Sequence, residues 1–243
     1  MPKSIEELID RELRRWEHER QIGARGGAAD AARAVTQPII TISRQHGSRG
    51  KKLALRLAGR FGYTLLHRDL IDRISTSTGH RRRLLEALDE HARSQITTWV
   101  DAMLSGRYLD ESDYVVGLLK TVHSIALLGG VVVVGRGANF IVEPGAGVHL
   151  RVVAPLEERV RNLMKRGNLT PAEAAREIKL VDEERAKFVR RHFHRSVDDP
   201  VAYDMIINES GHSLETLVAL ATTVVEEKLA RLGAPGLSPV PGT

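Results

Sequence analysis

The sequence contains no cysteine, so disulfides and thiolate metal ligands are excluded. It has no apolar run of about 18 residues or more, so no membrane-spanning helix is expected. Aromatic residues are 4% of the chain and hydrophobic residues 42%, so the core must consist mostly of Leu, Val, Ile and Ala. The first residues, MPKSIEELIDRELRRWE, lack the apolar centre of a signal peptide. These absences predict a soluble cytoplasmic protein.

Positive charge is in excess, with a net charge of +5 and a pI of about 9.7. This excess is typical of nucleic-acid-binding proteins, but it also fits a pocket for phosphates or an arginine-rich composition. Trp16 and Trp99 are too isolated to form a base-stacking surface, and no recognition helix or zinc finger is visible. His192 and His194 lie two residues apart, which does not suit metal binding on a helix. We therefore predict no nucleic-acid partner and no metal-ligand set, and we attribute the basic excess to phosphate-facing arginines plus composition.

Five short segments have the character of strands. Val131–Val134 is an all-apolar, β-branched run, as expected for a central parallel strand covered on both faces. Helical patterns separate the segments, and this alternation predicts an α/β fold with a five-stranded parallel sheet. The expected strands are residues 38–43, 63–66, 131–134, 148–154 and 203–208.

The rest of the chain divides around this sheet. Residues 1–36 form an N-terminal helical arm and a linker. A helix is expected over 4–18, with an apolar stripe that includes Ile5, Leu8, Ile9, Leu13 and Trp16, and the Gly- and Ala-rich GARGGAADAARAV that follows resembles a linker. This arm packs either on the body of the protein or on a second copy, as a homodimer contact. About 60 residues separate the second and third strands, too many for one crossover, so we expect a helical insert at about 69–128. The body ends near residue 232, and residues 233–243 read as a disordered tail.

The segment between the first strand and the following helix is nearly a phosphate-binding loop, G-x-x-x-x-G-K-[ST]. Gly50 and Lys51 match the pattern, whereas Gln45 replaces the first glycine and Lys52 replaces the hydroxyl residue. Such loops turn successive backbone N–H groups toward an anion, and the helix N-terminus adds a partial positive charge. The segment is either such a loop or an ordinary basic turn between a strand and a helix.

If it is a phosphate loop, its residues divide the work. Gly47 and Gly50 provide flexibility, and Ser48 can donate a hydrogen bond. Arg49 and Lys52 add positive charge, and Lys51 reaches the β- and γ-phosphates. The missing hydroxyl at position 52 weakens the case for a metal ion held by this loop.

Several longer stretches resemble the cytidylate-kinase-like family, relatives of bacterial cytidylate kinase among the P-loop nucleoside monophosphate kinases. They occur in the family order and span roughly residues 38–220. The most specific are the GRGANF segment and the APLEERV…EERAKF run. The full set is ITISRQHGSRGKKLALRLAGRFGY, LLHRDLID, VVVVGRGANFIV, LRVVAPLEERVRNLMKRGNLTPAEAAREIKLVDEERAKFV and DPVAYDMIINESGHSLE.

The resemblance implies a three-layer P-loop kinase fold with a helical insert and a helical lid at about 159–195. It implies transfer of the γ-phosphoryl group from ATP to CMP or dCMP with Mg²⁺, a reaction that depends on positioning and charge neutralisation. Arg68 and Asp69 match positions that contact the acceptor. Arg136, in the loop after the third strand, would bind the acceptor phosphate with its guanidinium fork. Alternatively, Arg136 is a loop arginine that caps a helix.

The implied lid carries Arg159, Arg166, Asp182 and Arg185 around a turn at residues 168–170. Asp182 and Arg185 resemble the acid-and-arginine pattern of the family lid. Arg185 is therefore the residue expected to stabilise the moving phosphoryl group, with Lys51 and Arg136 as its catalytic partners and Asp182 as an acceptor-binding residue. Each lid arginine could equally be an exposed helical charge that pairs with a glutamate.

The chain also departs from the family pattern. Cytidylate kinases have D-G-R-D where this chain has Val134-Gly135-Arg136-Gly137, and His67 stands at a usually acidic position. The family uses these acids to handle magnesium and to select CMP, so both functions are in question for this chain. Two alternatives to a CMP kinase thus stay open: a nucleotide- or phosphate-binding regulatory protein with impaired catalysis, and a kinase of another small acceptor.

Overall fold

The computed structural model describes residues 5–25, 37–107 and 112–232, and its centre is a five-stranded sheet in which all neighbouring strands are parallel. The predicted α/β architecture is confirmed, and each strand lies within two residues of its expected range. The spatial order is β2-β3-β1-β4-β5. The strands are β1 (Ile39–Arg44), β2 (Thr64–His67), β3 (Val131–Val134), β4 (Gly147–Val153) and β5 (Met205–Asn208).

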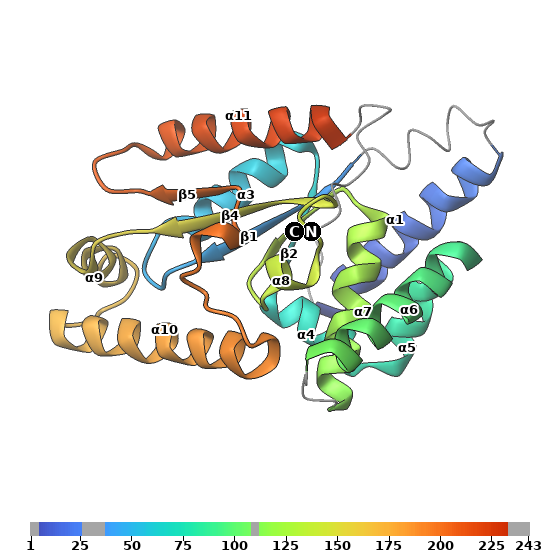
Figure 1. Ribbon diagram of the computed structural model, residues 1–243. Coiled ribbons are helices and arrows are strands. Elements are labelled where there is room, and N and C mark those ends of the chain that lie inside the picture. Colours follow the sequence, from blue (N-terminus) through green and yellow to red (C-terminus); the bar gives the residue numbers. More distant parts are fainter. Residues whose placement is uncertain (1–4, 26–36, 108–111, 233–243) are drawn as a thin grey trace.

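One face of the sheet is covered by α3 (Gly50–Phe61) and α11 (Leu214–Leu232), which lie above it in Figure 1. Alternate strand residues point into this layer because side chains of a strand alternate between its faces. They form a continuous apolar core with both helices. Its members include Ile40, Ile42, Val132, Val134, Leu150, Val152, Leu53, Leu57 and Leu217.

The other face carries the helices that connect β2 to β3: α4 (Arg68–Thr76), α5 (Thr78–Glu86), α6 (Glu90–Arg107) and α7 (Asp113–Leu128). Figure 1 shows them grouped at one end of the sheet. The short helix α8 (Ala138–Ile141) follows β3. The second core joins these helices to the sheet through Ile39, Val131 and Val133.

The N-terminal helix α1 (Ile5–Arg25) packs on this helical layer. Ile9, Leu13 and Trp16 are buried in the second core, and Asp10 accepts a 2.6 Å hydrogen bond from Arg83 of α5. The helix runs beyond residue 18, through part of the stretch that we interpreted as a linker. The predicted stripe is thus buried within this chain at these three positions, and contact with a second copy through the arm stays a prediction.

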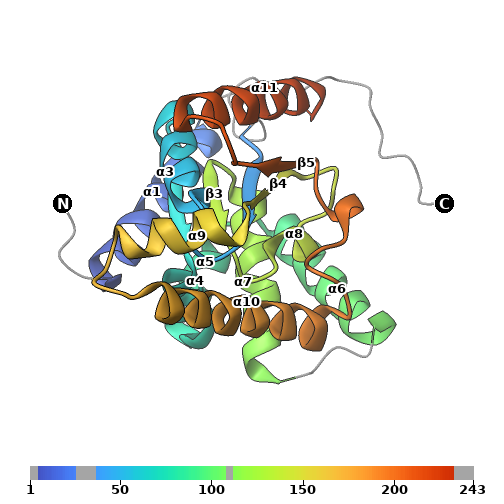
Figure 2. The same cartoon turned by 90° about the vertical axis from the view of Figure 1, so that its left-hand side faces the viewer.

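The remaining helices are α9 (Leu156–Met164) and α10 (Pro171–Phe193), which face the viewer in Figure 2. The predicted start of α10 is confirmed, with a reciprocal capping box between Thr170 and Glu173. The single-turn helix η1 (Pro200–Ala202) then leads to β5. No helix within residues 5–25, 37–107 and 112–232 is both long and apolar enough to cross a membrane. The predicted disordered tail, 233–243, lies outside the described residues.

Candidate active site

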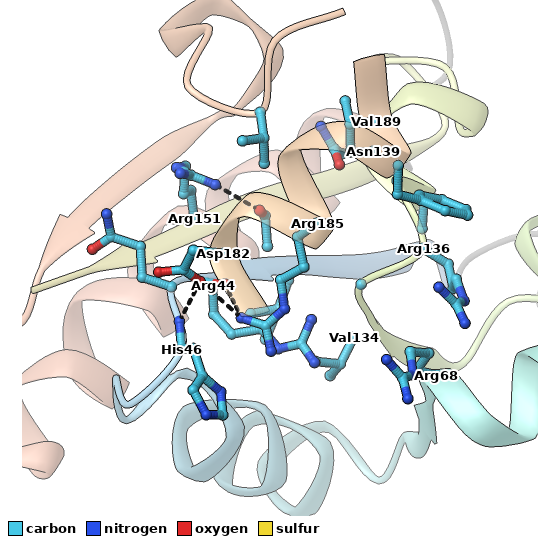
Figure 3. A pocket seen from close by; sticks show the side chains of 18 of the residues that line it. Arg44, His46, Arg68, Val134, Arg136, Asn139, Arg151, Asp182, Arg185 and Val189 are labelled. Atoms are coloured by element: carbon cyan, nitrogen blue, oxygen red, sulfur yellow. Dashed lines mark hydrogen bonds and ion pairs between the residues drawn. The ribbon is translucent and has the colours of Figure 1, made fainter. Parts of the chain in front are cut away.

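A cavity of about 710 Å³ opens at the carboxyl edge of the sheet, between the strand ends and α10. We call it the edge cavity (Figure 3). Its volume lies within the range of small-molecule sites, and its lining is rich in basic groups. The charged lining residues are Arg44, Lys51, Arg68, Arg136, Arg151 and Arg185, with Asp69, Asp182, Glu184 and Asp198 as the acids.

The topology explains why these basic residues meet. Arg44 is the last residue of β1, Arg68 directly follows β2, and Arg136 comes two residues after β3. Parallel strands end at the same edge of a sheet, where ligands of open α/β proteins bind. Three arginines far apart in sequence therefore lie at one edge, and α10 brings Arg185 to the same place.

A polar stripe crosses the cavity face of β1 and β4. Thr41 is in register with His149, and a 2.7 Å hydrogen bond joins Thr41 Oγ1 to His149 Nδ1. Ser43 is in register with Arg151, which donates to Ser43 Oγ at 2.9 Å and to Asp198 at 2.5 Å. The opposite faces of both strands are apolar. This face of the central sheet therefore supplies hydrogen-bonding groups to the cavity.

The 45–49 loop is shaped by helix α9 beside it. Gly47 has φ +81°, and a Cβ at this position would lie 2.7 Å from the Arg159 carbonyl oxygen. Asn162 donates to the Gly47 carbonyl at 3.0 Å, and Arg166 to the Ser48 carbonyl at 3.4 Å. The loop is thus clamped through its carbonyl groups, and only a glycine fits at position 47.

The loop presents part of the expected set of N–H donors. Among the described residues, none accepts a hydrogen bond from the N–H groups of Gly47, Lys51 or Lys52. The last two belong to the first turn of α3, where helical N–H groups have no intrahelical partner. Both lysine side chains are exposed, but only that of Lys51 is part of the cavity lining. An anion beside Gly47 and Lys51 would therefore meet donors and a positive charge.

The other loop residues are engaged within the protein. The Ser48 N–H donates to the Gln45 carbonyl at 3.3 Å, and the Gly50 N–H to Ser48 Oγ at 3.3 Å. The Arg49 N–H donates to the fully buried carboxylate of Glu209 at 2.6 Å. The Ser48, Arg49 and Gly50 amides therefore differ from our expectation of a nest open to phosphate.

The Arg49 side chain also differs from its expected role. Its guanidinium donates to the carbonyl groups of Glu209 and His212, at 2.7 and 2.8 Å, and does not line the cavity. Arg49 thus fixes the loop to the segment after β5. The sequence pattern could not show this, because Glu209 is 160 residues away.

Helix α10 binds the loop through carboxylates. Asp182 accepts from the His46 N–H at 2.8 Å and from Arg159 at 2.6 Å, and Glu177 accepts from the His46 ring at 2.7 Å. Arg185 donates to Asp182 at 3.3 Å and to the Arg44 carbonyl at 3.0 Å. The hairpin of α9 and α10 is therefore docked on the loop, with Arg185 turned into the cavity (Figure 3).

Arg136 lies in the cavity wall with its fork already occupied. Its Nε donates to Asp72 at 2.6 Å, and a second, short hydrogen bond joins its terminal nitrogen to the same carboxylate. Tyr114 donates to Asp72 at 2.9 Å, and the Phe188 ring lies under the guanidinium at 4.9 Å. Burial lowers the pKa of Arg136, but the hydrogen bonds to Asp72 and the nearby charges of Tyr114, Asp72 and Asp69 together outweigh it and raise the pKa. Arg136 is thus a fixed cation, whereas the sequence suggested a fork free for phosphate.

Arg44 is the main residue that the sequence analysis missed. Burial, and then the neighbouring positive charges of Arg185 and Arg68, lower its pKa to about 10. Among the described residues, none accepts a hydrogen bond from its guanidinium. Because it precedes the loop pattern, only the polar alternation of Thr41 and Ser43 signalled that this strand faces a site.

Arg68 and Asp69 lie at the mouth of the cavity. They form a 3.3 Å ion pair, and their side chains are 59% and 69% exposed. Beside them, burial lowers the pKa of His67, and Lys51 and Arg44 lower it further. His67 is thus neutral at physiological pH, and the mouth keeps its positive charge on Arg68.

The described residues contain no group of three or more His, Asp or Glu side chains able to hold a metal ion. The position that would supply a hydroxyl ligand is Lys52, and Asp182 already accepts from Arg159 and Arg185. These residues do not fit a protein-built magnesium site.

The family comparison covers most of the chain. A model described as the cytidylate kinase-like family matches residues 39–211, which includes β1 to β5 and the edge cavity. The N-terminal helix lies outside the matched segment.

A solved structure shares the fold, and two others show weaker similarity. An uncharacterized protein from Eubacterium ventriosum superposes with a TM-score of 0.62 at 19% identity, covering 79% of this chain and 99% of that one. A shikimate kinase from Bacteroides thetaiotaomicron gives a TM-score of 0.42 at 14% identity over 78% of this chain and 99% of its own. A gluconokinase from Sinorhizobium meliloti gives 0.44 at 14% identity, with coverages of 82% and 94%.

A curated relative matches over a shorter stretch. A uronate isomerase from Corynebacterium glutamicum is 28% identical over 104 residues, which are 42% of this chain. The match spans only 20% of that relative's length.

Proposed function

Because the chain belongs to the cytidylate kinase-like family, we propose that it transfers the γ-phosphoryl group of ATP to CMP, dCMP or a similar phosphate-bearing acceptor. The observation that carries this proposal is the edge cavity, where basic side chains from three strand ends and α10 surround a nucleotide-sized space. Phosphoryl transfer needs this kind of charge neutralisation more than it needs covalent participation.

The donor phosphates would lie at the start of α3. The N–H groups of Gly47, Lys51 and Lys52 would bind them, and the Lys51 ammonium would contact the β- and γ-phosphates. Magnesium would enter as the ATP complex, because Mg²⁺ usually keeps several waters and takes its other ligands from phosphates.

The acceptor would lie deeper along the edge. Arg68 reaches its phosphate from the mouth, Arg136 contributes a fixed charge, and Asp69 and Asp182 contact its polar part. An acceptor phosphate oxygen then attacks the γ-phosphorus, the bond to the bridging oxygen of ATP breaks, and ADP leaves. No general base is needed, since the attacking oxygen is already ionised.

Arg185 is the residue proposed to stabilise the moving phosphoryl group. It comes from α10, points into the cavity and is held by Asp182 and the Arg44 carbonyl. The docked hairpin of α9 and α10 would also keep water from competing with the acceptor.

The test is a coupled ADP-release assay with CMP, dCMP, UMP, AMP and non-nucleotide acceptors. Turnover with CMP or dCMP supports the proposal, and turnover with another acceptor alone assigns a different kinase activity to the same site. Absence of turnover with every acceptor overturns the proposal.

A second candidate is a nucleotide- or phosphate-binding regulatory protein without turnover. It is favoured by the carboxylates of Asp182 and Glu209, which already accept from the His46 and Arg49 amides. ATP binding by calorimetry without turnover on any acceptor supports this candidate, and turnover on any acceptor rejects it.

A further inference from the structure

The cavity contains a second positively charged group apart from the phosphate loop, and the proposed function leaves it partly unused. We call Arg44, Arg68 and Arg185 the arginine cluster. All three side chains line the cavity, and Figure 3 shows Arg44 between Arg185 and Arg68. They come from β1, from the start of α4 and from α10.

The charge of this cluster is only partly balanced. Asp182 accepts from Arg185 but also from Arg159 and the His46 N–H, and Asp69 lies 3.3 Å from the exposed Arg68. Within the described part of the chain, no carboxylate makes a hydrogen bond or ion pair with the Arg44 guanidinium. Mutual repulsion in a partly desolvated space is costly unless an anion offsets it.

The backbone makes room for the Arg44 side chain. A Cβ at Gly135, where φ is +91°, would lie 2.6 Å from an Arg44 terminal nitrogen, and one at Gly50 would lie 2.7 Å from Arg44 Cβ. Two glycines, one after β1 and one after β3, thus form a slot that holds the guanidinium at the cavity. A slot of this kind fixes one conformation of a side chain that otherwise has many.

The neighbouring walls define the rest of the ligand. Thr41, Ser43 and Asn139 contribute hydroxyl and amide groups to the lining, and Phe188 and Val189 of α10 contribute apolar surface. Such a mixed lining suits an uncharged ring or sugar that carries hydrogen-bonding groups.

We infer that the arginine cluster is a subsite for a phosphate monoester dianion, with Arg44 as its main anchor and the organic part of the ester along Thr41, Ser43 and Asn139. This inference rests on the proposed function in its choice of acceptor class. It changes one assignment: Arg44 takes the bidentate contact to the acceptor phosphate, because Asp72 holds the fork of Arg136.

The test is calorimetric titration of the full chain with inorganic phosphate, CMP and cytidine, without ATP or magnesium. Phosphate and CMP are expected to bind and cytidine is not. Arg44→Gln should weaken phosphate and CMP binding at least about tenfold, and Arg44→Lys should keep part of it because it retains charge without the fork.

The matched control is Arg56→Gln. Arg56 lies on α3, its side chain is 54% exposed, and it makes a 3.7 Å ion pair with Glu215 outside the cavity. This variant loses the same charge and should bind phosphate within about twofold of the wild type. If Arg44→Gln binds as tightly as Arg56→Gln, the inference is wrong.

Two further measurements distinguish a misfolded variant, a failure of the proposed function and a failure of this inference. Thermal unfolding checks that Arg44→Gln is folded; if it is not, the exposed Arg68→Gln replaces it, with the same expected loss. Phosphate binding that depends on Arg44, without turnover, defeats only the proposed function, whereas turnover with an unchanged KM for the acceptor in Arg44→Gln defeats only this inference.

Discussion

At the scale of single residues, the cavity depends on side chains whose partners lie far away in sequence. Lys51, Arg68 and Arg185 could be proposed from motifs, and all of them line the cavity. The sequence placed Arg136 at the sheet edge, but it could not predict that Arg136 pairs with Asp72, which is 64 residues away. Arg44 was not among the predicted site residues, because it precedes the phosphate-loop pattern. Motifs identify residue types at fixed spacings, whereas pairing depends on how distant elements meet.

Gly135 offers a direct test of the slot around Arg44. Gly135→Ala adds a methyl group 2.6 Å from an Arg44 nitrogen and imposes a φ of +91° on a residue with a Cβ. We expect a loss of about 1–3 kcal/mol in the free energy of unfolding, measured in urea.

Acceptor binding should fall in Gly135→Ala at the same time. In the double variant Gly135→Ala/Arg44→Ala, part of the lost stability should return, because the clash is removed. Equal losses in the single and double variants would show that Arg44 does not occupy the slot.

Glu209 and Arg49 form the anchor that holds the loop to the end of β5. Glu209 is fully buried and accepts from the Arg49 N–H, so Glu209→Ala leaves that donor and the Arg49 side chain without their carboxylate. We expect a stability loss of about 1–3 kcal/mol in urea unfolding. A double-mutant cycle with Arg49→Ala should show coupling between the two sites. Additive losses would show that Glu209 and Arg49 do not act together to hold the loop.

At the scale of elements, local sequence was a good guide wherever one rule dominated. The strands were placed within two residues because apolar β-branched runs and turn residues mark them, and α10 because Thr170, Pro171 and Glu173 form a strong start signal. The short helix α8 was not predicted, because four residues cannot show helical periodicity. Helix α1 was predicted too short, since the Gly- and Ala-rich stretch from residue 23 resembles a linker.

Strand β4 carries a buried histidine that makes stability depend on pH. Burial, and then the charge of Lys228, lower the pKa of His149 to about 4, although Asp204 and Glu143 oppose this. The unfolded chain binds a proton near pH 6.5, so it holds more protons than the folded chain between about pH 4 and 6.5. Stability is therefore complete above this window and falls as the pH drops through it.

The matched variant is His149→Gln, which keeps a hydrogen-bonding side chain beside Thr41. Urea unfolding at pH 7 and pH 5 should show that the wild type loses about 1–2 kcal/mol more than the variant. Equal losses would mean that His149 is protonated in the folded protein.

At the scale of the whole molecule, part of the positive charge behind the net value of +5 is concentrated in one place. One edge of the sheet carries arginines from β1, β4, α4, α10 and the loop after β3, and these line the edge cavity. From composition alone, the basic excess could reflect nucleic-acid binding, a pocket for phosphates or a generally arginine-rich composition. The fold favours the pocket, because topology brings the charges together in a concave site.

The proposed activity is phosphoryl transfer from ATP, bound at the start of α3, to a phosphate monoester in the edge cavity. Lys51→Ala should abolish turnover while leaving the unfolding transition unchanged, because Lys51 is exposed and has no ion pair among the described residues.

The most direct measurement is ³¹P NMR of ATP and CMP with the wild-type protein and with Lys51→Ala. Diphosphate signals of ADP and CDP are expected to grow with the wild type and not to appear with the variant. The proposed transfer is contradicted if CMP stays unphosphorylated with the wild type, or if Lys51→Ala produces CDP at the wild-type rate.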